Sequence, residues 1–510
     1  MKKSTAKKIL LFDDLLKKIK SLQDKGKVVV QSHGIFDLIH PGIIKHLDSA
    51  KEQGDALVVT VVRDEHVRKG PGRPIFPAQM RAENVASLSM VDHVCVVNDG
   101  RPFECVKRIK PDIFAKGRSI KDFDTNAPEK ILKEEKELYF GASRIHETAG
   151  FSFSSSEIIE NFLNIYPKEV KAFLKEFSRR YGFDSVREKI NGLVGLKVLL
   201  IGDGIIDEYH YCESLGKSAK SNLVVNKYLA HEIFAGGAFA IANHLAGLCV
   251  NVELISLLGN DPERESFVRK SLKPNVKIKF FHREDSPTVT KKRYINQYLN
   301  QKMFEVNYLN ENYINGRLES GIVEYLKTAI PHYDLVLVSD FGHGFITGKI
   351  IRSIEQYSVK FAVNTQVNAA NYGYNMVTKY RRPAFVCLDE HELRLTAKER
   401  FADIEHVARK VREGIDAACL IVTLGKNGSL GINKNKELNR TPVFSSKVVD
   451  TVGAGDAFFA FSAPCVAQNF PLELVSFIGN AAGALAVQIT CNKKPVEKYE
   501  LLEFIHALLK

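Results

Sequence analysis

Two short segments of this 510-residue chain combine glycine with a side chain that can accept a proton or bind phosphate. The first reads DTVGAGDAFFAF, residues 450–461, and an apolar helix is expected to follow its glycines. The backbone N–H groups of Gly453, Ala454 and Gly455 would form an anion-binding nest at the start of that helix. Asp456 is placed to accept the proton of an attacking hydroxyl group. The segment predicts phosphoryl transfer; the alternative is a glycine turn with an N-cap aspartate.

The second segment reads GIFDLIHPGIIKHL, residues 34–47, and follows a short β-branched run. Pro41 favours the first turn of a helix, and the free N–H groups of that turn suit a phosphate. His40 would donate a hydrogen bond to a phosphate oxygen. The alternative is a tight turn that uses one satisfied histidine. A zinc site made by His33, His40 and His46 is a weaker hypothesis, because their spacing matches no familiar ligand pattern.

Alternating strands and helices are expected to position both segments. In the N-terminal part, strands are predicted at 28–30, 56–62, 93–97 and 113–115, and helices at 79–89 and 103–109. In the C-terminal part, strands are predicted at 197–201, 335–339, 361–364, 385–388 and 420–423. We therefore expect an α/β protein with two doubly wound parallel-sheet domains, at 1–165 and 191–510. Residues 166–190 repeat apolar side chains at helical spacing and are expected to form a helical linker.

Composition excludes several other classes of protein. The 72 basic and 60 acidic residues give a net charge of +12, and residues 1–27 supply half of that excess. The remaining charge is spread thinly, so no nucleic-acid partner is expected. Eight Cys without a Cys-x-x-Cys pair argue against a disulfide scaffold and favour a reducing cytoplasm. No apolar stretch reaches the roughly 18 residues that span a bilayer, so no membrane association is expected.

The segment at 34–47 resembles the G-x-F-D-x-x-H-x-G-H motif of the cytidylyltransferase-like nucleotidyltransferases. A basic turn, a Lys-Gly turn and a serine-rich helix start follow in the order of that superfamily. Its enzymes join a nucleoside triphosphate to a phosphorylated alcohol or sugar and release pyrophosphate. The resemblance implies that His40 steadies the transition state and that ATP or CTP is bound. The implied nucleotide-binding residues are Gly34, Phe36, Asp37, Gly42, Arg73, Lys116, Ser154, Ser155 and Ser156, with Lys69 as an alternative to Arg73 for neutralising phosphate.

One position departs from this motif. Ile43 stands where the family has its second histidine, and the loss of one preorganised donor costs about 10²–10³ in turnover. His46 lies three residues further on and could compensate from roughly the same helix face. The alternative is that the domain binds a nucleotide without turning it over.

The segment at 450–461 resembles the D-T-x-G-A-G-D element of the ribokinase-like sugar kinases, the PfkB family. Several further motifs appear in that family's order. The resemblance implies an ATP-dependent kinase with Mg²⁺ as cofactor and a small β lid, here at 220–233, that often forms a dimer contact. The implied substrate-binding residues are Asp207, Gly236, Gly237 and Arg293, the last within a basic TVTKKR segment expected to contact an anionic substrate. The implied nucleotide-binding residues are Thr423, Gly425, Gly428 and Asn480, and the implied metal ligands are Asp389 and Glu392.

With both motif segments in one chain, the sequence resembles the bifunctional enzymes that activate heptose, but its two domains are in the opposite order. We expect one domain to phosphorylate a sugar or sugar phosphate and the other to couple a sugar phosphate to a nucleotide. The alternative keeps the kinase and makes the first domain a nucleotide-binding regulatory module.

Overall fold

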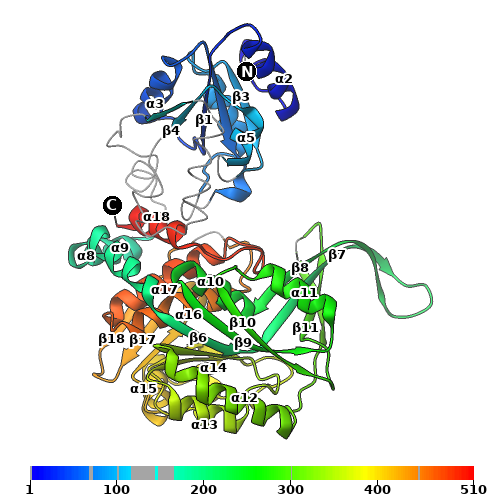
Figure 1. The fold of residues 1–510 in the computed structure, drawn as a ribbon, viewed down its shortest axis with the longest axis vertical. Coiled ribbons are helices and arrows are strands. Elements are labelled where there is room, and N and C mark those ends of the chain that lie inside the picture. Colours follow the sequence, from blue (N-terminus) through cyan, green and yellow to red (C-terminus); the bar gives the residue numbers. More distant parts are fainter. Residues whose placement is uncertain are drawn as a thin grey trace. The chain divides into compact units, whose positions relative to one another are not determined.

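The chain divides into two compact units, one formed by residues 1–187 with 498–510 and the other by residues 188–497 (Figure 1). The computed structural model describes residues 3–67, 73–99, 103–116, 144–147, 166–299, 301–445 and 448–509. Within these ranges, no helix is both long enough and apolar enough to cross a membrane.

The first unit contains a parallel five-stranded sheet in the order β3-β2-β1-β4-β5. Its strands are β1 (Val29–Gly34), β2 (Ala56–Val62), β3 (His93–Val97), β4 (Ile113–Lys116) and β5 (Arg144–Glu147). Its described helices before the linker are α1 (Lys3–Ala6), α2 (Phe12–Gln23), α3 (Pro41–Lys51), α4 (Ala78–Ala86) and α5 (Phe103–Ile109). The predicted parallel α/β arrangement is confirmed, and β2, β3 and α5 have the predicted bounds.

Both faces of this sheet are covered. Successive residues of β2 alternate between two apolar clusters, with Leu57 and Val59 in one cluster and Val58 in the other. Since strand side chains point alternately to opposite faces, the sheet is buried on both sides. This burial explains why β2 is a continuous run of β-branched and apolar residues.

The second unit is built on a nine-stranded sheet in the order β10-β9-β6-β13-β14-β15-β16-β17-β18. The strands from β10 to β16 run parallel, and β17 and β18 add an antiparallel edge. The strands are β6 (Lys197–Gly202), β9 (Asn251–Gly259), β10 (Val276–Arg283), β13 (Leu335–Asp340), β14 (Phe361–Thr365), β15 (Phe385–Asp389), β16 (Cys419–Thr423), β17 (Ser429–Asn433) and β18 (Leu438–Thr441). The helices are α10 (Ala238–Leu248), α11 (Pro262–Ser271), α12 (Gly316–Ala329), α13 (Gly348–Tyr357), α14 (Glu390–Ala397), α15 (Ile404–Gly414), α16 (Ala454–Ala467) and α17 (Leu472–Ala486).

A separate four-stranded sheet forms the lid of the second unit, in the order β12-β11-β7-β8. Its strands are β7 (Gly204–Lys217), β8 (Val224–Gly237), β11 (Thr290–Asn296) and β12 (Gln301–Tyr308). The β7–β8 hairpin projects from the body of its unit (Figure 1). The segment expected at 220–233 falls largely in β8, whereas the other three lid strands were not recognised from the sequence.

The linker segment 166–190 contains α8 (Lys168–Arg180) and α9 (Phe183–Asn191), in keeping with its helical spacing. The last helix, α18 (Lys498–Leu508), groups with the first unit, although the sequence assigned it to the C-terminal domain. The rings of Phe183 and His506 pack edge to face with centroids 4.6 Å apart, which accounts for this grouping.

Candidate active sites

The start of α16 is an open helix N-terminus. Gly453 precedes the helix with a φ of 89°, a conformation that favours glycine. A Cβ atom on Gly453 would lie 2.1 Å from Oδ1 of Asn492, whereas one on Gly455 would meet no described atom within 4 Å outside its own turn. The space beside Gly455 leaves room for a ligand at this end of the helix, and the N–H of Ala454 donates to the carbonyl oxygen of Thr451 at 3.3 Å.

Asp456 lies in the first turn of α16 and has the properties of a general base. Burial raises the pKa of its carboxyl group to about 7, the charge of Asp207 acts in the same direction, and Lys291 opposes both. No residue in the described part of the chain donates a hydrogen bond to this carboxylate. A carboxylate with a pKa near neutrality and unoccupied oxygens can accept the proton of an alcohol.

Asp450 anchors the glycine turn to the lid, a role that the sequence did not reveal. Its carboxylate accepts hydrogen bonds from Tyr209 Oη at 2.6 Å and Lys302 Nζ at 2.8 Å, both on lid strands. The backbone N–H groups of Val452 and Cys491 also donate to it, at 3.2 and 3.1 Å. The aspartate that opens the motif is therefore structural, and the one that closes it remains available for chemistry.

The inner face of the lid carries the predicted substrate residues. Asp207 is 4% exposed and forms an ion pair with Arg293, which also contacts Glu305 at 2.7 Å. A Cβ atom on Gly236 would lie 2.0 Å from Oδ2 of Asp207, so a side chain there would displace the Asp207 carboxylate. Gly237 is the N-cap of α10 with a φ of 56°. The guanidinium of Arg293 is thus already bound by two carboxylates. Its contact with an anionic substrate stays a prediction.

The predicted metal ligands form the N-terminal capping box of α14. Asp389 accepts the N–H of Glu392 at 2.7 Å, and Glu392 accepts the N–H groups of Asp389 at 2.8 Å and Val367 at 3.2 Å. Burial and the charges of Asp389 and Asp456 raise the pKa of Glu392 to about 8. A cation would relieve this accumulation of negative charge, so the donor set fits Mg²⁺. Within the described ranges, no group of three or more metal-ligating side chains is found.

The predicted nucleotide-binding residues lie around β16 and α17. Thr423 ends β16, and Gly425 and Gly428 adopt φ values of 55° and 83° in the turn that follows. A Cβ atom on Gly428 would lie 2.0 Å from the carbonyl oxygen of Thr441. Asn480 donates to Ser429 Oγ at 2.6 Å and so joins α17 to β17. The same amide nitrogen also donates to the carbonyl oxygen of Ser476 at 2.8 Å, and contact of Asn480 with a nucleotide stays a prediction.

In the first unit, the turn between β1 and α3 has the predicted form. His40 is the N-cap of α3, and its Nδ1 accepts the N–H of Gly42 at 3.2 Å. The ring proton therefore lies on Nε2, the atom that would donate to a phosphate oxygen. Phe36 adopts a φ of 51° and packs beside Gly34, where a Cβ atom would lie 3.1 Å from the ring. Asp37 accepts N–H groups of Ile75 and Phe76 at 2.8 to 3.1 Å and fixes the neighbouring loop.

Arg81 holds this turn in place and was not assigned a role from the sequence. It is fully buried, and its guanidinium donates to the carbonyl oxygens of Ile35, Val62 at 2.7 Å and Phe76 at 2.8 Å. It also contacts Asp64 at 2.6 Å. Of the other predicted residues, Arg73 is buried and Lys116 ends β4. Lys69, Ser154, Ser155 and Ser156 lie outside the described residues.

Residue 43, where the nucleotidyltransferase motif has its second histidine, lies in an apolar environment. Ile43 packs against the core cluster on one face of the sheet. His46 contacts Ser32 Oγ at 2.8 Å, and burial lowers its pKa, with His146 acting in the same direction. The zinc hypothesis is wrong for the described residues: His33 contacts Thr60, His40 caps α3 and His46 contacts Ser32, so the three rings serve separate contacts.

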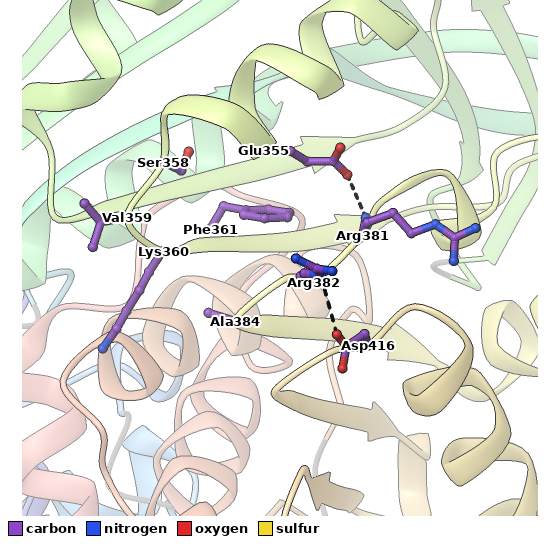
Figure 2. A pocket seen from close by; sticks show the side chains of 9 residues that line it. All are labelled: Glu355, Ser358, Val359, Lys360, Phe361, Arg381, Arg382, Ala384 and Asp416. Atoms are coloured by element: carbon purple, nitrogen blue, oxygen red, sulfur yellow. Dashed lines mark hydrogen bonds and ion pairs between the residues drawn. The ribbon is translucent and has the colours of Figure 1, made fainter.

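A pocket of about 540 Å³ in the second unit lies at the wrong edge of the sheet for this chemistry (Figure 2). Phe361 begins β14 and Ala384 precedes β15, so the pocket lies at the amino ends of these strands, whereas ligands of open α/β sheets bind at the carboxyl ends. Its charged groups are paired with one another or with backbone, including Arg382 with Asp416 at 3.6 Å (Figure 2). We assign no ligand to it.

Two family models match the chain, one over each of the two motif segments. The model described as pfkB family carbohydrate kinase matches residues 196–496, and the model described as cytidylyltransferase-like matches residues 32–161. Both predicted resemblances and their order along the chain are confirmed.

Named relatives are similar over part of the chain. "Bifunctional protein HldE" of Haemophilus influenzae is 25% identical over 313 residues, which cover 61% of this chain and 64% of that protein. The protein of the same name from Syntrophotalea carbinolica is 34% identical over 167 residues, 31% and 33% of the two chains. This chain thus spans less than two thirds of the length of these relatives.

A solved structure of phosphofructokinase-2 from Escherichia coli in complex with fructose-6-phosphate is similar in fold, with a TM-score of 0.50 at 14% identity. The similarity covers 62% of this chain and all of that chain. Since the kinase model matches more than half of the 510 residues, the chain belongs to the pfkB family of carbohydrate kinases.

Proposed function

We propose that the second unit transfers the γ-phosphoryl group of ATP to a hydroxyl group of a sugar or sugar phosphate, with Asp456 as the base. The acceptor oxygen bonds to the γ-phosphorus as the bond from that phosphorus to the bridging oxygen of ADP breaks. Asp456 takes the hydroxyl proton, and the N–H groups of Gly453, Ala454 and Gly455 stabilise the charge on the phosphoryl group. The raised pKa of Asp456 supports this assignment most directly.

Mg²⁺ is the expected cofactor of this reaction, and it would neutralise the charge on the phosphates. Asp389 and Glu392 are the residues proposed to hold it. Because backbone N–H groups already bond to Glu392, we expect contact through the waters that Mg²⁺ retains.

The kinase proposal is tested with the full chain, labelled ATP and a panel of sugars and sugar phosphates. Asp456→Asn should keep ATP binding and lose transfer by about 10²–10⁴-fold. The matched control is Asp416→Asn, which removes an exposed carboxylate at the opposite edge of the sheet. Transfer at the parental rate by Asp456→Asn would show that the base is elsewhere.

We also propose that the first unit couples a sugar phosphate to a nucleotide, from ATP or CTP, and releases pyrophosphate. The open alternative is a nucleotide-binding regulatory module, which the apolar packing of Ile43 favours. Pyrophosphate release from either nucleotide with a sugar phosphate separates the two. Release by the parent chain supports transfer; nucleotide binding without release, in both the parent and Ile43→His, supports the regulatory module.

We propose that the lid pairs two copies of the chain in the cytoplasm, with no nucleic-acid or membrane partner. Exposed apolar side chains gather on the lid strands and the β7–β8 turn, each at least half exposed: Leu215, Leu223, Val224, Tyr228 and Phe304. Burying such a group against a second copy would remove it from water. Light scattering should give a dimer for the parent and a monomer for Leu223→Lys with Val224→Lys; a monomeric parent would contradict this pairing.

A further inference from the structure

The segment that follows α17 places an asparagine side chain against the glycine turn before α16. Asn492 is partly buried, and a Cβ atom on Gly453 would collide with its Oδ1. Its carboxamide therefore packs directly on the turn that leads to Asp456. Within the part of the chain that the structure describes, this carboxamide forms no hydrogen bond. An amide side chain has two N–H donors and a carbonyl acceptor, so Asn492 can bind a polar ligand at this place.

The backbone before Asn492 is held in a specific conformation. Cys491 adopts a φ of 48°, a left-handed value that is rare for a residue with a side chain. Its N–H donates to Oδ2 of Asp450 at 3.1 Å, and its side chain lies in a buried cluster with Tyr209 and Phe234 of the lid. A non-glycine residue keeps such a conformation only where its surroundings fix it. The same contacts therefore fix the direction in which Asn492 leaves the chain.

The carboxamide of Asn492 also lies beside the paired glycines of the lid. A Cβ atom on Gly236, at the end of β8, would lie 3.5 Å from Nδ2 of Asn492 and still closer to Oδ2 of Asp207. A donor nitrogen and an acceptor oxygen are thus near one point. Arg293 donates to the other oxygen of Asp207, and no described residue donates to Oδ2. The two atoms are an unused donor and acceptor pair.

A hydroxyl group matches this pair, whereas an anion does not. A hydroxyl both donates and accepts, so it could donate to Oδ2 of Asp207 and accept from Nδ2 of Asn492. A phosphate or carboxylate oxygen has no proton to donate and would be repelled by the charge of Asp207. The reacting hydroxyl gives its proton to Asp456 in the proposed reaction. The hydroxyl that donates to Asp207 is therefore a different one on the same acceptor.

We propose that Asn492 binds a non-reacting hydroxyl group of the acceptor together with Asp207, and so selects acceptors by the position and configuration of that hydroxyl. Nδ2 of Asn492 donates to the hydroxyl oxygen, and the hydroxyl proton goes to Asp207. This inference rests on the proposed kinase activity and adds a residue that determines acceptor specificity.

Steady-state kinetics of the full chain test the inference, with the acceptor that the panel of sugars and sugar phosphates selects. Asn492→Ala should raise the KM for this acceptor about 3–30-fold, because one hydrogen bond is lost, and should leave the KM for ATP unchanged. Asn492→Asp keeps the shape of the side chain but loses both N–H donors, so it should raise the acceptor KM as well. Asn435→Ala is the matched control and should behave as the parent, because Asn435 is exposed between β17 and β18.

Monodeoxy analogues of the same acceptor separate hydroxyl binding from simple packing. Removal of the bound hydroxyl should raise the KM less in Asn492→Ala than in the parent, because the hydrogen bond from the amide is already absent. Removal of any other hydroxyl should have the same effect in both proteins. Equal effects for every hydroxyl would show that Asn492 only packs against Gly453, and would overturn the inference.

The remaining outcomes separate this inference from the kinase proposal. An unchanged acceptor KM in both Asn492 variants, or an equal rise in the KM for acceptor and ATP, would overturn the inference while the kinase activity stands. If no acceptor is phosphorylated, the kinase proposal fails, and calorimetry with the same sugars decides the inference. Sugar binding that Asn492→Ala weakens and Asn435→Ala does not supports it; equal binding by the two variants, or no binding, overturns it.

Discussion

The hydroxyl group of Tyr209 donates to Oδ2 of Asp450 over 2.6 Å, although 241 positions separate the two residues. Tyr209 belongs to lid strand β7, and Asp450 opens the turn that leads to Asp456. Lys302 of lid strand β12 contacts the other oxygen of the same carboxylate. One buried carboxylate therefore joins two lid strands to the turn that leads to Asp456, and we expect the position of the lid to be coupled to that of Asp456.

Tyr209→Phe should loosen this coupling. The variant removes one hydrogen bond to a buried charged group, which is worth about 1.5–3 kcal/mol of unfolding free energy. We also expect the KM for the acceptor to rise about 3–10-fold, because part of the free energy of this hydrogen bond stabilises the closed position of the lid. Tyr211→Phe is the control, since Tyr211 bonds to Glu232 on the lid at 2.7 Å and not to the turn. Equal changes in acceptor KM for both variants would contradict the coupling.

The pH dependence of phosphoryl transfer should report the ionisation of Asp456. A general base acts in its deprotonated form, and the pKa of this carboxyl group is raised to about 7. The value of kcat/KM should therefore rise about tenfold per pH unit below 7 and level off above it. The measurement uses saturating Mg²⁺, so that a bound cation keeps Glu392 ionised. Asp416→Asn should retain the profile; a flat profile from pH 5.5 to 8.5 in the parent would rule out Asp456 as the titrating base.

The sequence predicted the features that are local in the chain. Strands such as 93–97 and the turn around Gly453 depend on residue type and on periods of two or 3.6, which a short window contains. The same holds for His40, whose helix begins one residue later. Motif residues and strand bounds could therefore be found without coordinates.

The features that the sequence did not predict depend on distant partners. Asp207 and Arg293 are 86 positions apart and meet only because β7 and β11 pair in the lid. Asn480 donates to Ser429 across 51 positions, and Arg81 contacts carbonyl oxygens on three different segments. No periodicity signals such a contact, since it is set by tertiary packing.

The stability of the second unit should also depend on Asp456. Its folded-state pKa is about 7, above its ordinary value of 3.8. Its contribution to stability is therefore fully present below about pH 4 and is lost as the pH rises through 7, because the unfolded state releases this proton first. Asparagine does not ionise, so the Asp456→Asn variant does not lose this stability as the pH rises. Relative to the parent, the variant should gain about 1–3 kcal/mol between pH 5 and pH 8.

Urea denaturation at both pH values, followed by hydrogen exchange in α16, measures this difference. Asp416→Asn is the control again, because its carboxylate is largely exposed. A gain for Asp456→Asn that is the same at pH 5 and pH 8 would show that its carboxyl group is not perturbed by the fold.

Arg81 should be essential for the shape of the β1–α3 turn of the first unit. Its buried guanidinium donates to the carbonyl oxygen of Ile35, inside the β1–α3 turn, and to that of Phe76, whose N–H group bonds to Asp37. Arg81→Met would leave these carbonyl groups and the contact with Asp64 without their partner. We expect a loss of about 3–5 kcal/mol in unfolding free energy, because several hydrogen bonds from a charged donor are lost and each is worth about 1.5–3 kcal/mol.

Hydrogen exchange of β1 and β2 in the full chain locates this loss, and nucleotide binding by the first unit should weaken with it. Arg108→Met is the control, because Arg108 is 58% exposed and its contact with Asp13 is 3.8 Å long. It should change the exchange of β1 by less than about 0.5 kcal/mol, as surface substitutions do. If Arg81→Met exchanges like Arg108→Met, the turn holds its shape without the guanidinium, and the geometry of His40 must come from the helix cap alone.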